Sequence, residues 1–152
     1  MTYLATGPAV GHYPDSVDDW VMLPSVDLSA YTACQVRLTM EVWRNAEKFG
    51  LVNYDGGNLQ YTIDASGASG WAIVGGATML YDGKLTDCSG SCVVSNQQTW
   101  TTSANPKWKT AVYEGAVPGP TVRLRFAFHS DISNESGPLP GIYVRRLQVD
   151  VF

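Results

Sequence analysis

Two stretches of the chain alternate between apolar and polar residues, which is the pattern of a half-buried β-strand. The first runs from Gln35 to Trp43 and the second from Thr121 to His129, and Val, Leu, Met or Phe occupies every even position in both. Successive side chains of a strand point to opposite faces of its sheet. Each stretch therefore predicts a strand with one face on a core and one face toward solvent.

Shorter apolar stretches predict further strands at 20–23, 59–63, 71–74, 79–81 and 109–113. The apolar positions between Ile142 and Val151 change phase at Arg145 and Arg146, which predicts a β-bulge that returns them to one face. Loops rich in Gly, Ser, Asn, Asp and Pro separate these stretches, and no long helical periodicity occurs. We predict one all-β domain over residues 1–152, an antiparallel two-sheet β-sandwich of jelly-roll type with about eight strands.

The composition agrees with strands and argues against several classes of protein. The 152 residues suit one domain, and the 5 Trp, 8 Tyr and 4 Phe favour pleated sheets. A net charge of −4 does not provide the basic surface that a nucleic-acid-binding protein needs. No segment approaches the roughly 18 consecutive apolar residues of a membrane span. We therefore expect no nucleic-acid partner and no membrane insertion.

Two of the three cysteines, Cys88 and Cys92, bracket the tripeptide Ser-Gly-Ser. Such a pair can close a short disulfide loop, which indicates an oxidising compartment. A zinc site is the alternative, but the chain offers no second cysteine pair and only two distant histidines. We predict the disulfide, and we expect Cys34 to be a small buried side chain.

Four passages in fixed order carry a resemblance to a known family. They are LPSVDLS at 23–29 with EVW at 41–43, YDGGNLQY at 54–61, VRLRFAFHSD at 122–131 and PGIYVRRLQV at 140–149. Together they resemble the MAM-like jelly-roll modules, including the accessory β-domain of immune-inhibitor-A-type secreted metallopeptidases and bacterial cell-surface proteins. The resemblance covers about residues 20–151. Two features depart from it, namely Arg145 at a position that is usually acidic, and a stretch at about 82–108 that resembles an insertion.

The resemblance implies a non-catalytic extracellular module, secreted or displayed at the cell surface, that is sometimes stabilised by calcium. By the family pattern, Glu41, Asp55 and Asp131 are the candidate ligands, because calcium prefers carboxylate and carbonyl oxygens. Weaker candidates are Asp18, Asp19 and Asp150. The alternative is that Asp55 is an ordinary turn residue and that Asp131 caps a loop.

Motifs of the common hydrolases do not occur in the sequence. There is no Gly-x-Ser-x-Gly and no His-Glu-x-x-His. His129, Ser130 and Asp131 are consecutive, and neighbours on a strand point to opposite faces, so His129 and Ser130 cannot act together in a triad. A carboxylate pair of a glycosidase depends on the fold and leaves no sequence signature. We expect a protein that is not an enzyme.

Carbohydrate binding is the main functional alternative, since Trp100, Trp108 and Asn105 combine aromatic surface with a hydrogen-bonding amide. These tryptophans could equally pack in the core or under loops, as we expect for Trp20 and Trp43, which flank apolar stretches. The arginines at outward strand positions, Arg123, Arg125, Arg145 and Arg146, are available to pair with acidic residues of the same domain or of a second copy.

The sequence thus predicts a recognition or adhesion module whose partner is an extracellular protein, a second copy or a glycan. A passive accessory role beside a secreted metallopeptidase is the remaining alternative.

Overall fold

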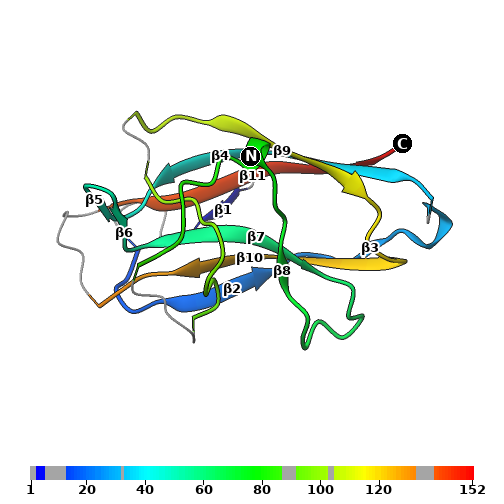
Figure 1. Cartoon of the computed structure of the whole chain (residues 1–152), viewed down its shortest axis with the longest axis horizontal. Helices are drawn as coiled ribbons and strands as arrows, with labels where there is room; N and C mark the ends of the chain where they lie inside the picture. The colour runs from blue at the N-terminus through cyan, green and yellow to red at the C-terminus, as the bar shows by residue number, and fades with distance from the viewer. Residues whose placement is uncertain (1–2, 6–12, 32, 87–91, 103–104, 133–138) are drawn as a thin grey trace.

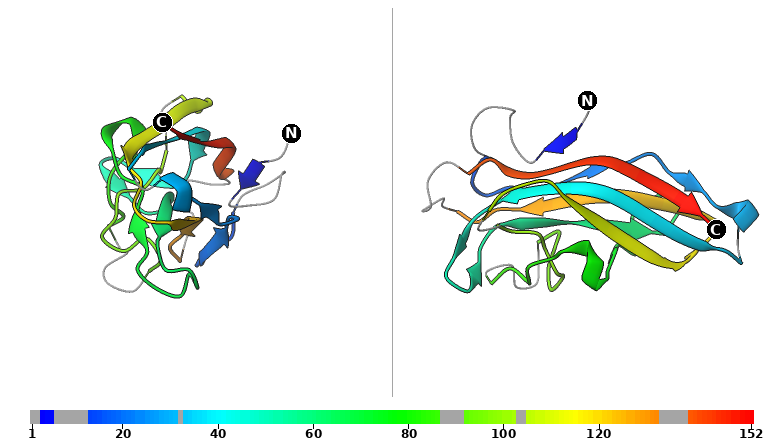
Figure 2. Two further views of the ribbon diagram at one scale, coloured as in Figure 1. Left: turned by 90° about the vertical axis from the view of Figure 1, so that its right-hand side faces the viewer. Right: turned by 90° about the horizontal axis from the view of Figure 1, so that it is seen from above.

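The protein consists of antiparallel β-sheets in two packed layers, which confirms the all-β prediction (Figure 1). The computed structural model describes residues 3–5, 13–31, 33–86, 92–102, 105–132 and 139–152. The sandwich is longer along its strands than across them (Figure 2). No helix in these described stretches is long and apolar enough to cross a membrane.

The first sheet has four strands, and the second has five. In order across the first sheet they are β1 (Tyr3–Ala5), β11 (Gly141–Val151), β4 (Gln35–Asn45) and β9 (Lys109–Ala116). In the second sheet they are β2 (Asp18–Met22), β10 (Thr121–His129), β7 (Gly56–Thr62) and β8 (Ala72–Ile73), and β3 (Val26–Asp27) also pairs with β10. A separate hairpin joins β5 (Lys48–Phe49) to β6 (Val52–Asn53), and two short 3-10 helices are η1 (Ser29–Tyr31) and η2 (Ala77–Met79).

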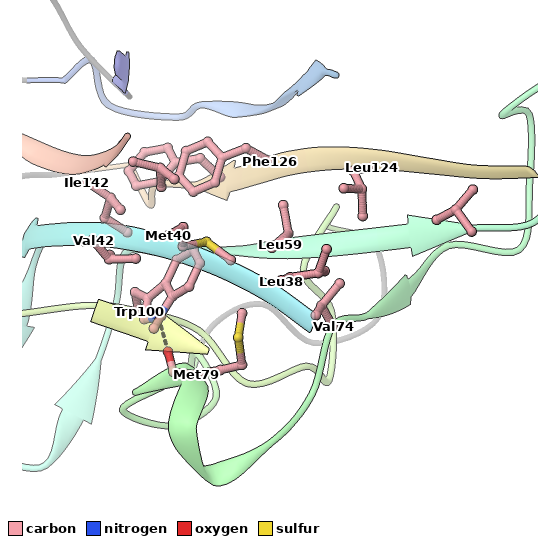
Figure 3. Close-up of a cluster of buried hydrophobic side chains, with 14 of the residues drawn as sticks. Leu38, Met40, Val42, Leu59, Val74, Met79, Trp100, Leu124, Phe126 and Ile142 are labelled. Atoms are coloured by element: carbon pink, nitrogen blue, oxygen red, sulfur yellow. Dashed lines mark hydrogen bonds between the residues drawn. The ribbon is translucent and has the colours of Figure 1, made fainter. Parts of the chain in front are cut away.

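The apolar faces of β4 and β10 form the core as their alternation predicts. Met40 is 0% exposed and Phe126 is 3% exposed. Figure 3 shows these side chains meeting Leu59 and Ile142 between the layers. Burying each such side chain stabilises the fold by roughly 1.5–3 kcal/mol.

The predicted β-bulge is present in β11. Its register against β4 shifts between Arg145 and Gln148, and Arg146 has a φ of 56°. The shift lets Val144, on one side of the bulge, and Val149, on the other, both contribute to the core cluster.

Several local predictions were wrong. The stretch 79–81 is not a strand, because Met79 ends η2 and Leu80 adopts a left-handed conformation with a φ of 62°. The short strands β1, β3, β5 and β6 were not predicted, because segments of two or three residues show no alternation. Trp20 is 47% exposed instead of buried, because it pairs with Ala127 on the outer face of the second sheet and its strand, β2, lies at the edge.

Described residues of the stretch at about 82–108 pack on both sides of the second sheet. Leu85 and Val94 pack on Ala127 at its outer face. Trp100 is 0% exposed in the core, and its indole N–H donates to the Met79 carbonyl at 2.6 Å (Figure 3). This stretch therefore supplies part of the core.

Candidate functional site

Three carboxylates meet at one end of the sandwich. Each of them lies two residues after the last residue of a strand, namely β4, β6 or β10. Glu47 lies between β4 and β5, Asp55 lies between β6 and β7, and Asp131 follows β10. One oxygen from each lies within 4.8 Å of the others. Glu47 is 3% exposed and Asp55 is 1% exposed. We call these three residues the acidic cluster.

Hydrogen bonds from Tyr13 and from the backbone hold the acidic cluster in place. The Tyr13 hydroxyl donates to Asp55 Oδ2 at 2.5 Å, and the Asp131 backbone N–H donates to Asp55 Oδ1 at 2.7 Å. The Glu47 backbone N–H in turn donates to the Tyr13 hydroxyl at 3.0 Å. Asp55 thus ties together chain segments that lie far apart in the sequence.

The environment disfavours the charge on Asp55. Burial raises the pKa of Asp55 to about 6, and the nearby Asp131 and Glu47 carboxylates add to the increase, although the hydrogen bonds from Tyr13 and from the Asp131 backbone oppose it. Burial and the bond to Asp55 also raise the pKa of Tyr13 far above its usual value. A bound cation would remove this electrostatic penalty.

The donor set suits a hard cation. Calcium takes six to eight oxygen ligands, and magnesium also prefers oxygen, whereas zinc prefers nitrogen and sulfur. Glu47, Asp55 and Asp131 offer carboxylate oxygens only. Each carboxylate oxygen has a second lone pair, so the bonds that Asp55 accepts still leave it able to act as a ligand.

The structure brings together only two of the three predicted metal ligands. Asp55 and Asp131 are in the acidic cluster, but Glu41 lies on β4 and pairs with Arg145 at 2.6 Å and with Arg146 at 3.2 Å. These two arginines therefore have a partner within the domain. The third carboxylate of the cluster is Glu47, which the sequence analysis did not single out.

The weaker metal candidates also lie elsewhere. Asp18 accepts a hydrogen bond from the backbone of Val93, Asp19 bonds the N–H of the next residue, and Asp150 accepts from Gln148. Asp18 also belongs to a second group of possible ligands with Cys92 and His129. Cys92 already has an interaction partner, so its sulfur is not available as a ligand.

The predicted disulfide lies partly outside the described residues, because Cys88 is not among them, and it stays a prediction. Cys34 is a free cysteine, as expected, but its side chain is partly exposed instead of buried.

Burial excludes one of the three predicted sugar-binding residues. Trp100 is 0% exposed, so it cannot contact a ligand, and that prediction was wrong. Trp108 is half-buried and stacks on the Arg145 guanidinium, which lies 3.9 Å from the ring centre. Asn105 is exposed.

Three large apolar side chains that lie close in sequence to the acidic cluster are strongly exposed. Phe49 and Leu51, in the β5–β6 hairpin, are 76% and 97% exposed, and Ile132, which directly follows Asp131, is 86% exposed. We call these three residues the apolar tip. Single exposed apolar residues are ordinary on protein surfaces, whereas several at one end of a molecule can mark a contact site.

No protein-family model and no curated protein matches this chain. The resemblance to MAM-like modules therefore stays a prediction.

Proposed function

We propose that the protein is a non-catalytic recognition module that assembles with further copies of itself through the apolar tip. The observation that carries the proposal is the exposure of Phe49, Leu51 and Ile132 beside the acidic cluster. A divalent cation, with calcium as the first candidate, would brace the loops from which the tip projects. The setting we propose is extracellular, secreted or at a cell surface.

Jelly-roll connectivity is part of the proposal, and the strand orders support it. With β3, β5 and β6 set aside, the chain visits the sheets as β1, β2, β4, β7, β8, β9, β10 and β11. The orders β1-β11-β4-β9 and β2-β10-β7-β8 then correspond to the two interleaved sheets of a jelly roll. In such folds the sheets are a rigid scaffold and the loops make the contacts.

The surroundings of Ser130 argue against a serine nucleophile at the sequence His129-Ser130-Asp131. Ser130 is 2% exposed, and its hydroxyl donates to the Pro14 carbonyl while accepting from the Val17 N–H. His129 faces Asp18 at 3.3 Å. The hydroxyl is thus engaged with the backbone and is not presented to a substrate.

The opposite end of the sandwich offers a complementary surface. An apolar pocket lies between the sheets there, and its lining includes Val26, Leu28, Val36, Tyr61, Tyr113 and Pro118. The apolar tip follows the Asn45 end of β4, whereas the pocket lies at the Gln35 end of the same strand. The two surfaces are therefore separated by about 35 Å, the length of an 11-residue strand. The free volume of the pocket is about 30 Å³, which is too little for a whole phenylalanine or leucine side chain, so the tip of one copy would pack over the apolar rim of the pocket of the next. That contact leaves the first copy's own pocket rim uncovered, which permits a head-to-tail chain.

Sedimentation velocity tests the proposal across a range of protein concentrations with calcium present. We expect the native protein to form oligomers whose size grows with concentration, and the double variant Phe49→Ser, Leu51→Ser to stay monomeric. The control is Val21→Ser, an exposed apolar residue on β2, which should associate like the native protein.

A mixing experiment distinguishes head-to-tail contact from contact between two tips. Pro118→Glu places a charge at the exposed edge of the pocket and should also give monomers. Mixed with the double tip variant it should form dimers, because one protein keeps a tip and the other keeps a pocket. A native protein that stays monomeric at every concentration, or a tip variant that associates normally, overturns the proposal.

A further inference from the structure

Arg125 is a nearly buried cation without an acidic partner. It lies on β10, is 9% exposed, and points to the outer face of the second sheet, opposite the core side chains of Leu124 and Phe126. Among the described residues, no carboxylate oxygen lies within the 4.0 Å of an ion pair from it. Burying a charge without a counter-ion is costly, and here burial lowers the pKa of Arg125 while the more distant Asp18 opposes the shift.

Two tryptophans cover the guanidinium of Arg125. Its central carbon lies 5.0 Å from the centre of the Trp20 ring and 4.3 Å from the centre of the Trp71 ring. Trp20 comes from β2 on one side of β10, and Trp71 immediately precedes β8 on the other. Both contacts are cation–π interactions. They stabilise the positive charge, but they provide no hydrogen-bond acceptor for the guanidinium N–H groups.

Other contacts fix the orientation of this group. Arg125 Nε donates to Gln60 Oε1 at 2.6 Å, and Gln60 Nε2 donates to the Val93 carbonyl and to Gln97 Oε1, both at 2.8 Å. The Trp71 indole N–H donates to the Gly67 carbonyl at 3.1 Å. The guanidinium is thus held in one position before any ligand arrives, which lowers the entropic cost of binding.

The two terminal nitrogens of the guanidinium lie at the surface without an acceptor in the described part of the chain. Neither nitrogen has a hydrogen-bond partner among the described residues, and neither belongs to the buried polar atoms of those residues that lack a partner. Both nitrogens therefore reach solvent. This edge is the part of arginine that binds a carboxylate through two parallel hydrogen bonds.

We propose that Arg125 and Trp20 bind an acidic sugar residue, such as a uronic or sialic acid. The carboxylate of the sugar accepts two hydrogen bonds from the terminal nitrogens of Arg125. The apolar face of its ring packs against Trp20, which is 47% exposed and offers a flat surface beside the cation. The site lies on a sheet face and at neither end of the sandwich, so it does not depend on the self-assembly proposed above.

Titration of the intact protein with small probes tests the proposal, with binding measured by tryptophan fluorescence and by amide chemical shifts. The probes are methyl glucuronide, the sialic acid methyl glycoside, neutral methyl glucoside, acetate and inorganic phosphate. We expect at least one acidic sugar to bind at least tenfold more tightly than methyl glucoside, acetate or phosphate. Equal binding of acetate or phosphate would identify a general anion site and overturn the assignment to a sugar.

Three variants identify the residues responsible. Arg125→Lys keeps the charge but loses the planar edge, and Trp20→Ala removes the stacking surface, so each should weaken acidic-sugar binding at least tenfold. The control is Arg123→Lys, on the same strand and face, whose Nε bonds the Ala65 carbonyl, and it should bind like the native protein. Since Trp20 is exposed, its variant keeps the test valid if Arg125→Lys fails to fold. Undiminished binding by Trp20→Ala, or no binding of any acidic sugar, refutes the proposal.

Discussion

Replacing Asp55 by asparagine should remove a pH dependence of stability that its burial creates. The folded-state pKa of about 6 lies above the ordinary value of 3.8, so the folded protein binds this proton more tightly than the unfolded chain does. Stability from this group is therefore complete below about pH 4 and is lost as the pH rises to about 6. A difference of about 2 between the folded and unfolded pKa corresponds to about 3 kcal/mol of unfolding free energy.

Urea unfolding at several pH values between 4 and 7.5, with a chelator present, measures this effect through tryptophan fluorescence. The asparagine side chain of the Asp55→Asn variant would keep an acceptor for the Asp131 N–H and carry no charge. We expect the unfolding free energy of the native protein to fall by about 3 kcal/mol relative to Asp55→Asn between pH 4 and pH 7. The control is Asp64→Asn: the pKa of Asp64 is lowered to about 2 by hydrogen bonds from Ser66, so it does not titrate in this range.

Calcium should offset the loss of stability at higher pH, because it binds the ionised carboxylates of the acidic cluster. At a calcium concentration of 100 times the dissociation constant, the native protein should gain about 2.7 kcal/mol above pH 6, whereas Asp55→Asn should gain much less. A native protein whose stability relative to Asp55→Asn stays constant from pH 4 to pH 7 would refute the electrostatic reasoning. A melting temperature that calcium leaves unchanged would refute the proposed cation.

Three further substitutions test the packing and the outer face. Phe126→Ala should lower the unfolding free energy by about 3–5 kcal/mol in urea titrations, because Phe126 is 3% exposed in the core. Gly57→Ala should lower the melting temperature, because its new Cβ would lie 2.5 Å from the Ala127 carbonyl oxygen; an unchanged value would contradict that contact. Glu41→Gln should cost no more than about 1 kcal/mol, and less at high salt, because the pair with Arg145 is partly exposed to solvent.

The sequence predicted the long strands well because each has one buried face. The alternation at 35–43 and 121–129 matches β4 and β10, and the phase change at Arg145 matches the bulge in β11. The same reasoning failed for strands of two or three residues, which are too short to show a period. It also failed for Trp20, because its apolar neighbours do not reveal that the side chain lies on the outer face of an edge strand.

The candidate site was predicted only in part for a different reason. Asp55 lies in a turn and Asp131 follows a strand, and both positions can be recognised in the sequence. Glu47 and Tyr13 come close to these two residues only after distant segments pack together. A charged residue in a loop is usually solvated, so nothing local indicates that Glu47 is 3% exposed. The pairing of Glu41 with Arg145 likewise depends on the contact between β4 and β11.

The strand order has a consequence for when the chain can fold. The strands β1, β2 and β4 all lie in the first 45 residues, yet none pairs with another of them. Their partners are β9, β10 and β11, the last three strands to be synthesised. The second sheet needs β10, which ends at His129, and the first sheet needs β11, which ends at Val151, and such non-local pairing makes folding slow, on the order of milliseconds to seconds. During synthesis β1, β2 and β4 therefore stay without their sheet partners until β9, β10 and β11 have been made, and an unpaired segment of this kind can still be threaded through a narrow channel.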